Sequence, residues 1–324
     1  MLLQLRLYLL VGLLFAILYG VIVGIGFLLG YSGFTFYIFI FGIGFVIILI
    51  QYLIGPKTVE WSMRVKYIKE NENPKLYGIV REQAQLAGLP KTPRIGVSQL
   101  QIPNAFAFGR TKRDARVCVT KGILDLLSDE ELKAVIGHEI SHIKHRDVAV
   151  ITMLSVVPMI CYMLYISFFW GGMFSGGRSR NGGAMLIVGI LALVVYFITS
   201  LLVMYGSRIR EYYADKGSVE LGNQPHQLAT ALYKLVYGNA KSDPKAIKSS
   251  AGMKAFFVND PSRAMYEIRD LKEVDVDMSG TIDQNELMMV TTKDIKLGKA
   301  ERTVEILSSH PNMLKRIKHL ASLQ

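Results

Sequence analysis

Four long stretches without a charged residue constrain the fold of this 324-residue chain more than any other feature. They cover residues 7–29, 34–54, 148–170 and 184–205, and each has 21 to 23 residues. A helix needs about 20 apolar residues to cross the hydrocarbon core of a bilayer. Buried helices of a soluble core are the alternative, but four uninterrupted stretches of this length argue against it. The sequence therefore predicts a four-span transmembrane helical bundle.

The stretches divide the chain into segments. The first is too long for the apolar region of a cleavable signal peptide, which has about 7–15 residues. Because only residues 31–33 separate it from the second stretch, residues 1–54 are predicted to form a transmembrane hairpin. Residues 148–205 form a second predicted hairpin, around a Gly-rich 171–183 loop. Residues 55–147 and 206–324 are predicted to lie outside the membrane.

The net charge of +11 is concentrated in two of these segments. Residues 55–147 carry sixteen Lys and Arg and residues 206–324 carry eighteen, whereas the 31–33 turn carries none and the 171–183 loop only two. Basic residues gather in cytoplasmic loops, where they also suit anionic headgroups. The pattern predicts a multi-pass protein of the cell (inner or plasma) membrane, with both termini and both basic segments cytoplasmic. It also explains the charge without a nucleic-acid partner.

The segment after the second stretch has short periodic elements. We expect a helical continuation over residues 59–69, a helix over 74–88, and strands at 94–97, 105–109 and 116–120. A short helix at 122–127 precedes a longer one from Ser128 to about His145, which leads almost without a break into the third stretch. The fourth stretch likewise runs directly into residues 208–220. The predicted fold is mainly α (α+β), with one small β-sheet.

The helix after Ser128 carries the most informative motif. Ser128 and Glu131 have the spacing of a capping box, which fixes where the helix begins. His138 and His142 then lie about one turn apart on one face, where two imidazoles can bind one zinc ion. Glu139 can reach a water on that ion and accept its proton. The H-E-x-x-H pattern predicts one catalytic zinc per chain; a polar surface helix is the alternative.

A catalytic zinc needs a third protein ligand. His145 lies near the same face but a full turn beyond His142, so we expect it to be solvated or to face headgroups. Glu211, just past the fourth stretch, is the better candidate because the hairpin returns the chain to the level where it left. Asp215, four residues on, can accept the free ring N–H of a zinc-bound histidine. Glu211 and Asp215 could instead form surface pairs with Arg208 and Lys216.

These motifs resemble the HtpX-type membrane metallopeptidases. The matching residues are His138 to His142 with Arg146-Asp147, the segment from Ser207 to Asp215, residues 104–109, and residues 119–124. The resemblance covers most of the chain and implies a zincin-like cytoplasmic domain. It implies cleavage of damaged or misassembled membrane proteins, with the strand of Asn104, Ala105 and Phe106 as the edge where a substrate lies; proteases commonly bind peptides by such strand addition. His310 resembles the histidine of the family's C-terminal His-Pro segment and could stabilise an oxyanion; alternatively it only starts the last helix.

Residues 275–286 form a motif that the resemblance does not lead us to expect. The twelve-residue pattern is that of an EF-hand loop, with a glycine, Gly280, at position 6 and apolar residues at helical spacing on both sides. We predict a calcium site; an acidic solvated turn is the alternative. Its ligands are Asp275, Asp277, Ser279, Thr281, Asp283 and Glu286. We further hypothesise that calcium there regulates the C-terminal part of the zinc site.

The sequence therefore predicts a zinc metalloendopeptidase that takes membrane-protein or unfolded polypeptide substrates. A membrane sensor or scaffold that keeps the metal fold without catalysis is one alternative, but a purely structural zinc site needs no Glu139 and usually has four protein ligands. A CAAX prenyl protease, which shares the two zinc motifs, is another. Those enzymes are larger and have more spans. Zinc itself is inferred from ligand type, so other divalent ions stay open.

Overall fold

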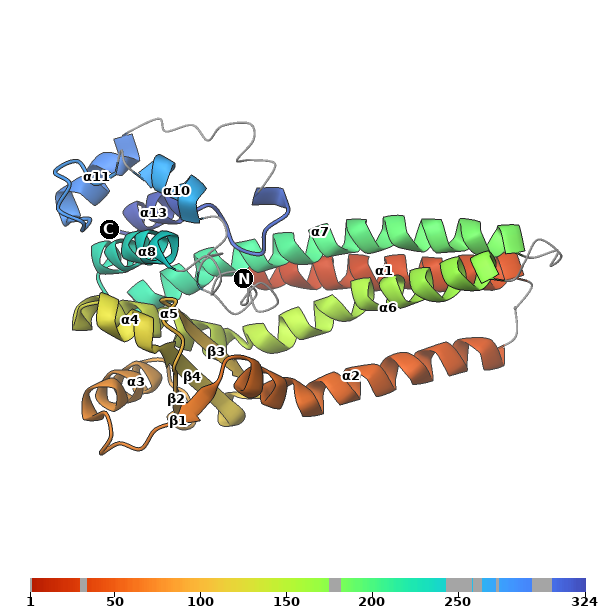
Figure 1. Ribbon diagram of the computed structural model, residues 1–324, viewed down its shortest axis with the longest axis horizontal. Coiled ribbons are helices and arrows are strands. Elements are labelled where there is room, and N and C mark those ends of the chain that lie inside the picture. Colours follow the sequence, from red (N-terminus) through yellow and green to blue (C-terminus); the bar gives the residue numbers. More distant parts are fainter. Residues whose placement is uncertain are drawn as a thin grey trace. The chain divides into compact units, whose positions relative to one another are not determined.

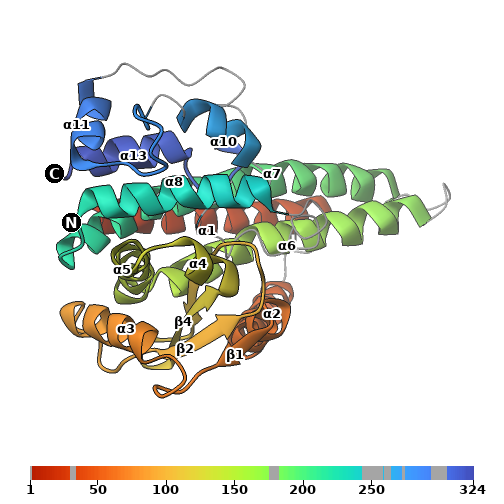
Figure 2. The same cartoon turned by 60° about the vertical axis from the view of Figure 1, so that its left-hand side comes forward.

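The computed structural model describes residues 2–29, 34–174, 182–242, 258, 264–271, 274–292 and 305–324. The predicted turn at residues 31–33 and most of the 171–183 loop lie outside the described residues. The chain is mainly helical with one small sheet (Figures 1 and 2). In chain order the elements are α1 Leu2–Leu29, α2 Phe34–Ser62, β1 Val65–Tyr67, α3 Pro74–Leu86, β2 Arg94–Ser98, β3 Ala105–Gly109, η1 Lys112–Asp114, β4 Ala115–Thr120, α4 Lys121–Leu126, α5 Asp129–His145, α6 Asp147–Phe174, α7 Gly182–Glu220, α8 Pro225–Lys241, α10 Ala264–Leu271, α11 Gln284–Thr292 and α13 Met313–Ala321.

The chain divides into two compact units. Unit 1 comprises Met1–Gly55 and Val150–Gly206, and unit 2 comprises Pro56–Ala149 and Ser207–Gln324. Helices α2, α6 and α7 each contribute to both units. The assignment of residues 1–54 and 148–205 to the membrane, and of residues 55–147 and 206–324 to the protease, stays a prediction.

Unit 1 is helical and apolar. Among the described residues, three helices are long and apolar enough to cross a membrane, namely α1, α6 and α7, with mean hydropathies of 2.6, 2.1 and 2.8 over their most apolar windows. Leu14 and Leu18 of α1 pack against Leu154 and Val157 of α6, while many other apolar side chains of these helices are exposed. The fourth predicted span, residues 34–54, lies within helix α2, and its crossing of a membrane stays a prediction.

Unit 2 is built on a mixed sheet with strand order β1-β2-β4-β3. Strands β2 and β4 are parallel, whereas β1 pairs with β2 and β3 pairs with β4 in antiparallel register. Ile95, Val117 and Val119 pack with α3 and α5 in the main core. Phe106 and Phe108 belong instead to a second cluster that includes Met63, just after helix α2. Because β3 is the last strand in this order, it lies at an edge of the sheet, and it contacts α5.

The three predicted strands are confirmed to within one residue, but the predicted helix over residues 59–69 is wrong in its second half. Helix α2 ends at Ser62, Arg64 takes a left-handed conformation (φ 49°), and Val65–Tyr67 forms strand β1. Val65 and Tyr67 are residue types that favour strands. Pairing with Gly96–Ser98 of β2 satisfies their backbone groups, and helical periodicity could not reveal that distant partner.

The predicted helix boundaries around the motif are confirmed. Both hydrogen bonds of the capping box between Ser128 and Glu131 are present at the start of α5. Arg146 adopts a left-handed conformation (φ 59°) and ends α5, and α6 begins at the next residue. Helix α7 is continuous from Gly182 to Glu220, so the fourth apolar stretch and the segment after it are one helix.

Candidate metal centre

Helix α5 presents its two motif histidines to each other. The Nε2 atoms of His138 and His142 are 3.1 Å apart, and the rings are nearly perpendicular, at 89°. His138 is almost fully buried and His142 is mostly buried. Both rings therefore point into the protein with their Nε2 atoms converging on one point, as the spacing on a helix predicts.

Helix α7 brings Glu211 to the same point. Its carboxylate oxygens lie 3.6 Å from His138 Nε2 and 3.5 Å from His142 Nε2. One ligand atom from each of the three residues lies within 4.8 Å of the others. We call His138, His142 and Glu211 the candidate metal cluster. Exposed His145 is not part of it, and its Nδ1 lies 2.9 Å from the carbonyl oxygen of Ser141.

A glycine lets the two helices approach closely enough for this geometry. A Cβ atom on Gly217 of α7 would collide with Ser141 Oγ of α5 and lie 2.7 Å from Ser141 Cβ. Contact distances below about 3 Å are not sustained without a shift of one partner. The absence of a side chain at Gly217 therefore sets the spacing between α5 and α7. Gly217 lies about 1.7 helical turns after Glu211.

The cluster fits a catalytic zinc ion. Two imidazole nitrogens and one carboxylate are a known catalytic ligand set, and ligand atoms around one zinc at about 2.0–2.1 Å are about 3.4 Å apart. The three donor groups are separated by comparable distances. Among the described residues, buried Glu211 Oε2 receives no hydrogen bond, and its cationic neighbour is Arg316 Nη1 at 3.1 Å.

His138 has the carboxylate partner that the sequence predicts. Asp215 Oδ1 lies 2.8 Å from His138 Nδ1, and the Asp215 side chain is fully buried. Arg316 of α13, also fully buried, donates to both Asp215 oxygens at 2.9 and 2.6 Å and lies 3.1 Å from Glu211 Oε2. Burial raises the pKa of Asp215, but Arg316 and His138 outweigh this and hold it below its usual range. Asp215 is therefore an anion that can fix the His138 tautomer.

His142 has a carboxylate partner that sequence reasoning missed. Asp147 Oδ2 lies 2.6 Å from His142 Nδ1, and Arg210 Nε of α7 lies 3.0 Å from Asp147 Oδ1. Both charged side chains are buried. The only sequence signal was the match of Arg146-Asp147 to the resemblance, which assigned no role to Asp147.

The electrostatics favour protons on the histidines of the metal-free cluster. Burial lowers the pKa of His142, but the hydrogen bonds with Asp147 and Glu211 outweigh it and raise the pKa to about 10. Burial likewise lowers the pKa of His138, but its hydrogen bonds with Asp215 and Glu211 outweigh this and raise that pKa. Burial raises the pKa of Glu211, yet His310 and Arg316 hold it well below its usual range. A metal ion must therefore displace protons when it binds.

Glu139 lies between the cluster and the edge strand. Its side chain is buried, and burial raises its pKa against the opposing effects of His142 and His138. The backbone N–H of Ala107, in β3, interacts with the carboxylate. A carboxylate of raised pKa beside a metal site is suited to accept and return a proton.

His310 is brought to the same centre. Its side chain is buried, Nδ1 lies 3.5 Å from Glu211 Oε2, and neither ring nitrogen has a hydrogen-bond partner among the described residues. Arg208 of α7 holds this segment by donating to the carbonyl oxygens of Glu305, Ile306 and Ser308. The ring nitrogens thus remain available to a group that enters the site.

The three residues proposed to bind substrate are themselves buried. Ala105 faces the core, Phe106 packs in the cluster with Met63, and Asn104 Oδ1 accepts a hydrogen bond from the Val258 N–H at 2.9 Å. Their side chains are therefore occupied. A peptide can use only the outer backbone edge of β3 there.

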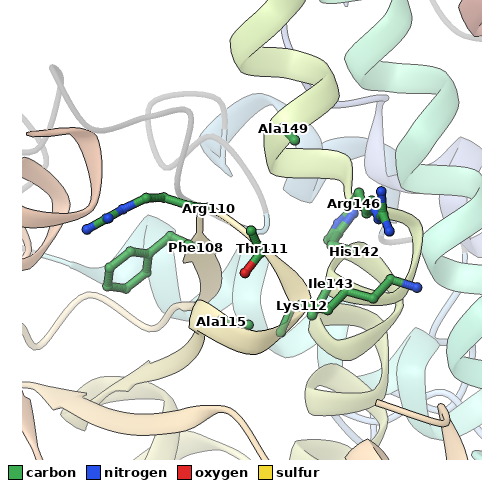
Figure 3. Close-up of a pocket in the computed structure, with 10 residues that line it drawn as sticks. Phe108, Arg110, Thr111, Lys112, Ala115, His142, Ile143, Arg146 and Ala149 are labelled. Carbon is green, nitrogen blue, oxygen red and sulfur yellow. The ribbon is translucent and has the colours of Figure 1, made fainter. Parts of the chain in front are cut away.

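An open hollow with a cavity volume of only about 30 Å³ lies at the far end of β3 beside His142 (Figure 3). Its lining is mostly apolar, with basic side chains among it. The residues are Phe108, Gly109, Arg110, Thr111, Lys112, Ala115, His142, Ile143, Arg146 and Ala149.

Residues 275–286, which we call the acidic loop, follow α10, run into the first turn of α11 and form a second cluster. Ligand atoms of Asp275, Asp277 and Glu286 lie within 4.8 Å of one another, and Asp275 and Glu286 are buried. Gly280 has φ +81°, the conformation that position 6 of an EF-hand loop requires. Asp283 accepts the Glu286 N–H at 2.7 Å and does not join this group. Ser279 and Thr281 hydrogen-bond to each other.

The acidic loop is attached to helix α8, which packs between α5 and α13 (Figure 2). The Thr230 hydroxyl accepts the Ile282 N–H at 2.9 Å and donates to the Ile282 carbonyl at 2.8 Å. The Tyr233 hydroxyl donates to Asp275 Oδ2 at 2.7 Å. Lys234, the next residue, forms an ion pair with Glu131 of the α5 capping box at 2.7 Å. Three neighbouring residues of α8 thus link the loop to the helix that carries the motif.

Comparisons with known proteins identify the family. Residues 70–324 match the profile of peptidase family M48. A protease HtpX homolog of Methanothermobacter thermautotrophicus is 53% identical over 72% of this chain and 86% of its own length. One from Thermoplasma volcanium is 33% identical over 88% of this chain and 83% of its own length.

Among solved structures, the crystal structure of S. mikatae Ste24p is similar in fold, with a TM-score of 0.51 and 16% identity. The match covers 94% of this chain and 62% of the Ste24p chain. Together with the profile match and the HtpX relatives, these findings place the protein: it belongs to peptidase family M48, in the HtpX-type group.

Proposed function

We propose that this family M48 metallopeptidase is an integral-membrane zinc endopeptidase that cleaves misfolded or damaged membrane proteins on the cytoplasmic side. The convergence of His138, His142 and Glu211 beside Glu139 carries the proposal. This ligand set leaves a coordination position open and places a base next to it, which a purely structural zinc site does not need.

Zinc would supply a bound water of lowered pKa and would polarise a peptide carbonyl. Glu139 would accept the proton of the attacking water and return it to the departing amine, because burial raises its pKa and so makes its carboxylate a stronger base. His310 donates a hydrogen bond to the developing oxyanion, because its ring nitrogens are buried and without partners among the described residues. Asp215 and Arg316 hold His138 in place.

The substrate is a polypeptide that adds to the outer edge of β3. Membrane-protein substrates are supported by the three apolar helices of the same chain. The cytoplasmic location of the site and of both termini is supported by the basic residues of 55–147 and 206–324.

The decisive experiment compares the parent protein with a Glu139→Gln variant, purified in detergent with chelator to prevent self-cleavage. Zn²⁺ is then added to each with an unfolded membrane-protein substrate, supplied in an unprenylated and a prenylated form. We expect zinc-dependent cleavage by the parent and about 10²–10⁴-fold less by the variant, with zinc binding retained. Zinc binding without cleavage by either would favour a sensor or scaffold. Cleavage only of prenylated substrates would favour a CAAX protease.

We also propose that the acidic loop binds calcium and modulates this activity through α8. The path is the pair of hydrogen bonds between Ile282 and Thr230, followed by the ion pair between Lys234 and Glu131. Ordering of the loop by a cation therefore acts on the start of the helix that holds His138 and His142.

Two variants separate binding from modulation. Glu286→Gln removes a ligand and is expected to lower calcium affinity. Thr230→Val keeps the shape of the side chain but removes both hydrogen bonds to Ile282, so we expect calcium to bind while its effect on activity is lost. Activity indifferent to calcium and to Glu286→Gln would reject modulation.

A further inference from the structure

Each histidine of the candidate metal cluster has its own buried carboxylate, and each carboxylate has its own buried arginine. Asp215 lies 2.8 Å from His138 Nδ1 and accepts a hydrogen bond from Arg316. Asp147 lies 2.6 Å from His142 Nδ1 and pairs with Arg210 at 3.0 Å. We infer that Asp147, held by Arg210, is the positioning residue that fixes the tautomer and ring orientation of His142 for metal binding.

The backbone is arranged to make this contact. On a continuous helix, a residue five positions after His142 would lie roughly 140° around the helix from it and could not reach its ring. The left-handed Arg146 ends α5 instead, and the chain restarts as α6 at Asp147. A non-glycine residue in this conformation is uncommon. The turn thus places Asp147 back against His142.

The charges are consistent with a positioning role. Asp147 is 4% exposed and Arg210 is 6% exposed, so neither carries an ordinary surface charge. Asp147 Oδ2 is directed at His142 and Oδ1 at Arg210, so the carboxylate uses both oxygens. A neutral imidazole with its proton held on Nδ1 presents Nε2 as the lone-pair donor. Arg210 lies one residue before Glu211, so the same turn of α7 supplies both the third candidate ligand and the support of Asp147.

This inference rests on the proposed zinc function, and its test separates the two. The full-length protein is purified in detergent in a Glu139→Gln background, which prevents self-digestion. The key variant is Asp147→Asn with Arg210→Gln, which removes both charges and leaves neither partner as an unpaired buried charge. Asn matches Asp in size, whereas Gln is shorter than Arg. Arg210→Lys is the conservative variant. The control is Lys133→Gln with Glu82→Gln, which neutralises an exposed ion pair of α5 away from the site.

The readouts are Zn²⁺ affinity by chelator competition, the visible spectrum of bound Co²⁺, and circular dichroism of the metal-free protein. We expect the Asp147/Arg210 double variant to remain folded, to bind Zn²⁺ about 10- to 100-fold more weakly, and to give an altered Co²⁺ spectrum. Arg210→Lys, with Asp147 intact, should keep most of the parental Zn²⁺ affinity, and the control pair should match the parent. If the double variant does not fold, Asp147→Asn alone is measured in the same assays; it leaves the buried charge of Arg210 without its carboxylate.

Parental zinc affinity and an unchanged Co²⁺ spectrum in the folded double variant would overturn the role of Asp147, even if the parent binds zinc and cleaves substrate. An equal loss in the control pair would overturn it too, because the effect would then be general. Failure of the parent protein itself to bind zinc would reject the proposed function and this inference with it. The ratio of the Zn²⁺ affinities of variant and parent thus tests the positioning role of Asp147, and the parent alone tests the proposed function.

Discussion

The candidate metal cluster and the acidic loop are assembled in different ways. The cluster takes its residues from α5 and α7, with support from α6 and α13, and its members are separated by up to 73 positions of sequence between His138 and Glu211. The acidic loop takes its three clustered carboxylates from twelve consecutive residues. The cluster therefore depends on helix packing, whereas the loop depends on local backbone conformation.

The largest expected effect comes from removing a ligand of the cluster. Glu211→Gln should lower kcat/KM by about 10³-fold or more, because a lost metal removes several kcal/mol of transition-state stabilisation. Calcium affinity of the acidic loop should stay parental. Zinc and calcium titrations of the same preparation test both statements, and a simultaneous loss of calcium binding would break the distinction between the two regions.

Helix packing at the cluster is tested by Gly217→Ala. The added methyl group collides with Ser141, so we expect a loss of about 1–3 kcal/mol in the free energy of unfolding and weaker zinc binding as Glu211 moves away. Gly78→Ala in α3 is the matched control. No atom lies within 4 Å of a Cβ there, so it should be neutral or stabilising by up to about 1 kcal/mol. Equal behaviour of the two variants in thermal unfolding would contradict this account.

The two regions should also differ in their response to pH. The pKa of His142 is raised from 6.5 to about 10 in the metal-free fold. Its proton therefore stabilises that fold fully below about 6.5, and this stabilisation is lost as the pH rises toward about 10. Zinc must displace the proton, so zinc affinity should increase with pH by about tenfold per unit for each proton released.

Hydrogen bonds from Ser279 hold the pKa of Asp277 below its usual range, so its carboxylate is already charged at neutral pH. Calcium affinity should then be nearly constant between about pH 6 and about pH 8. Titration calorimetry in buffers of different ionisation enthalpy counts the protons released at each site. Proton release on calcium binding, or none on zinc binding, would argue against this difference.

The smallest expected effect concerns the link between the regions. Lys234→Gln removes a partly exposed ion pair with Glu131 and should cost about 0.2–1 kcal/mol of stability. It should also reduce the effect of calcium on activity without changing either metal affinity. Activity measured with and without calcium checks this, with Lys133→Gln as the control for loss of a lysine from the same unit. A full calcium response in Lys234→Gln would place the link elsewhere.

Local chemistry accounts for what could be predicted from sequence. The capping box of Ser128 and Glu131, the spacing of His138 and His142, and the turn glycine Gly280 all act within a few residues, and each appears as expected. The apolar stretches likewise predicted the helices of unit 1, because the length of such a stretch is a property of consecutive residues. Glu211 and Asp215 were also predicted as neighbours of the histidines. A hairpin returns the chain to the level where it left, so the polar residues that follow the fourth apolar stretch are expected beside α5.

Tertiary structure decided the rest, because those contacts depend on partners that are distant in sequence or on a break in backbone geometry. Strand β1 exists because β2 is available to pair with Val65–Tyr67. Asp147 reaches His142 because Arg146 adopts a left-handed conformation. Arg316 reaches Asp215 from 101 residues away, and Thr230 reaches Ile282 from 52. Sequence patterns fix the types of groups and their local spacing, whereas packing selects which of them meet.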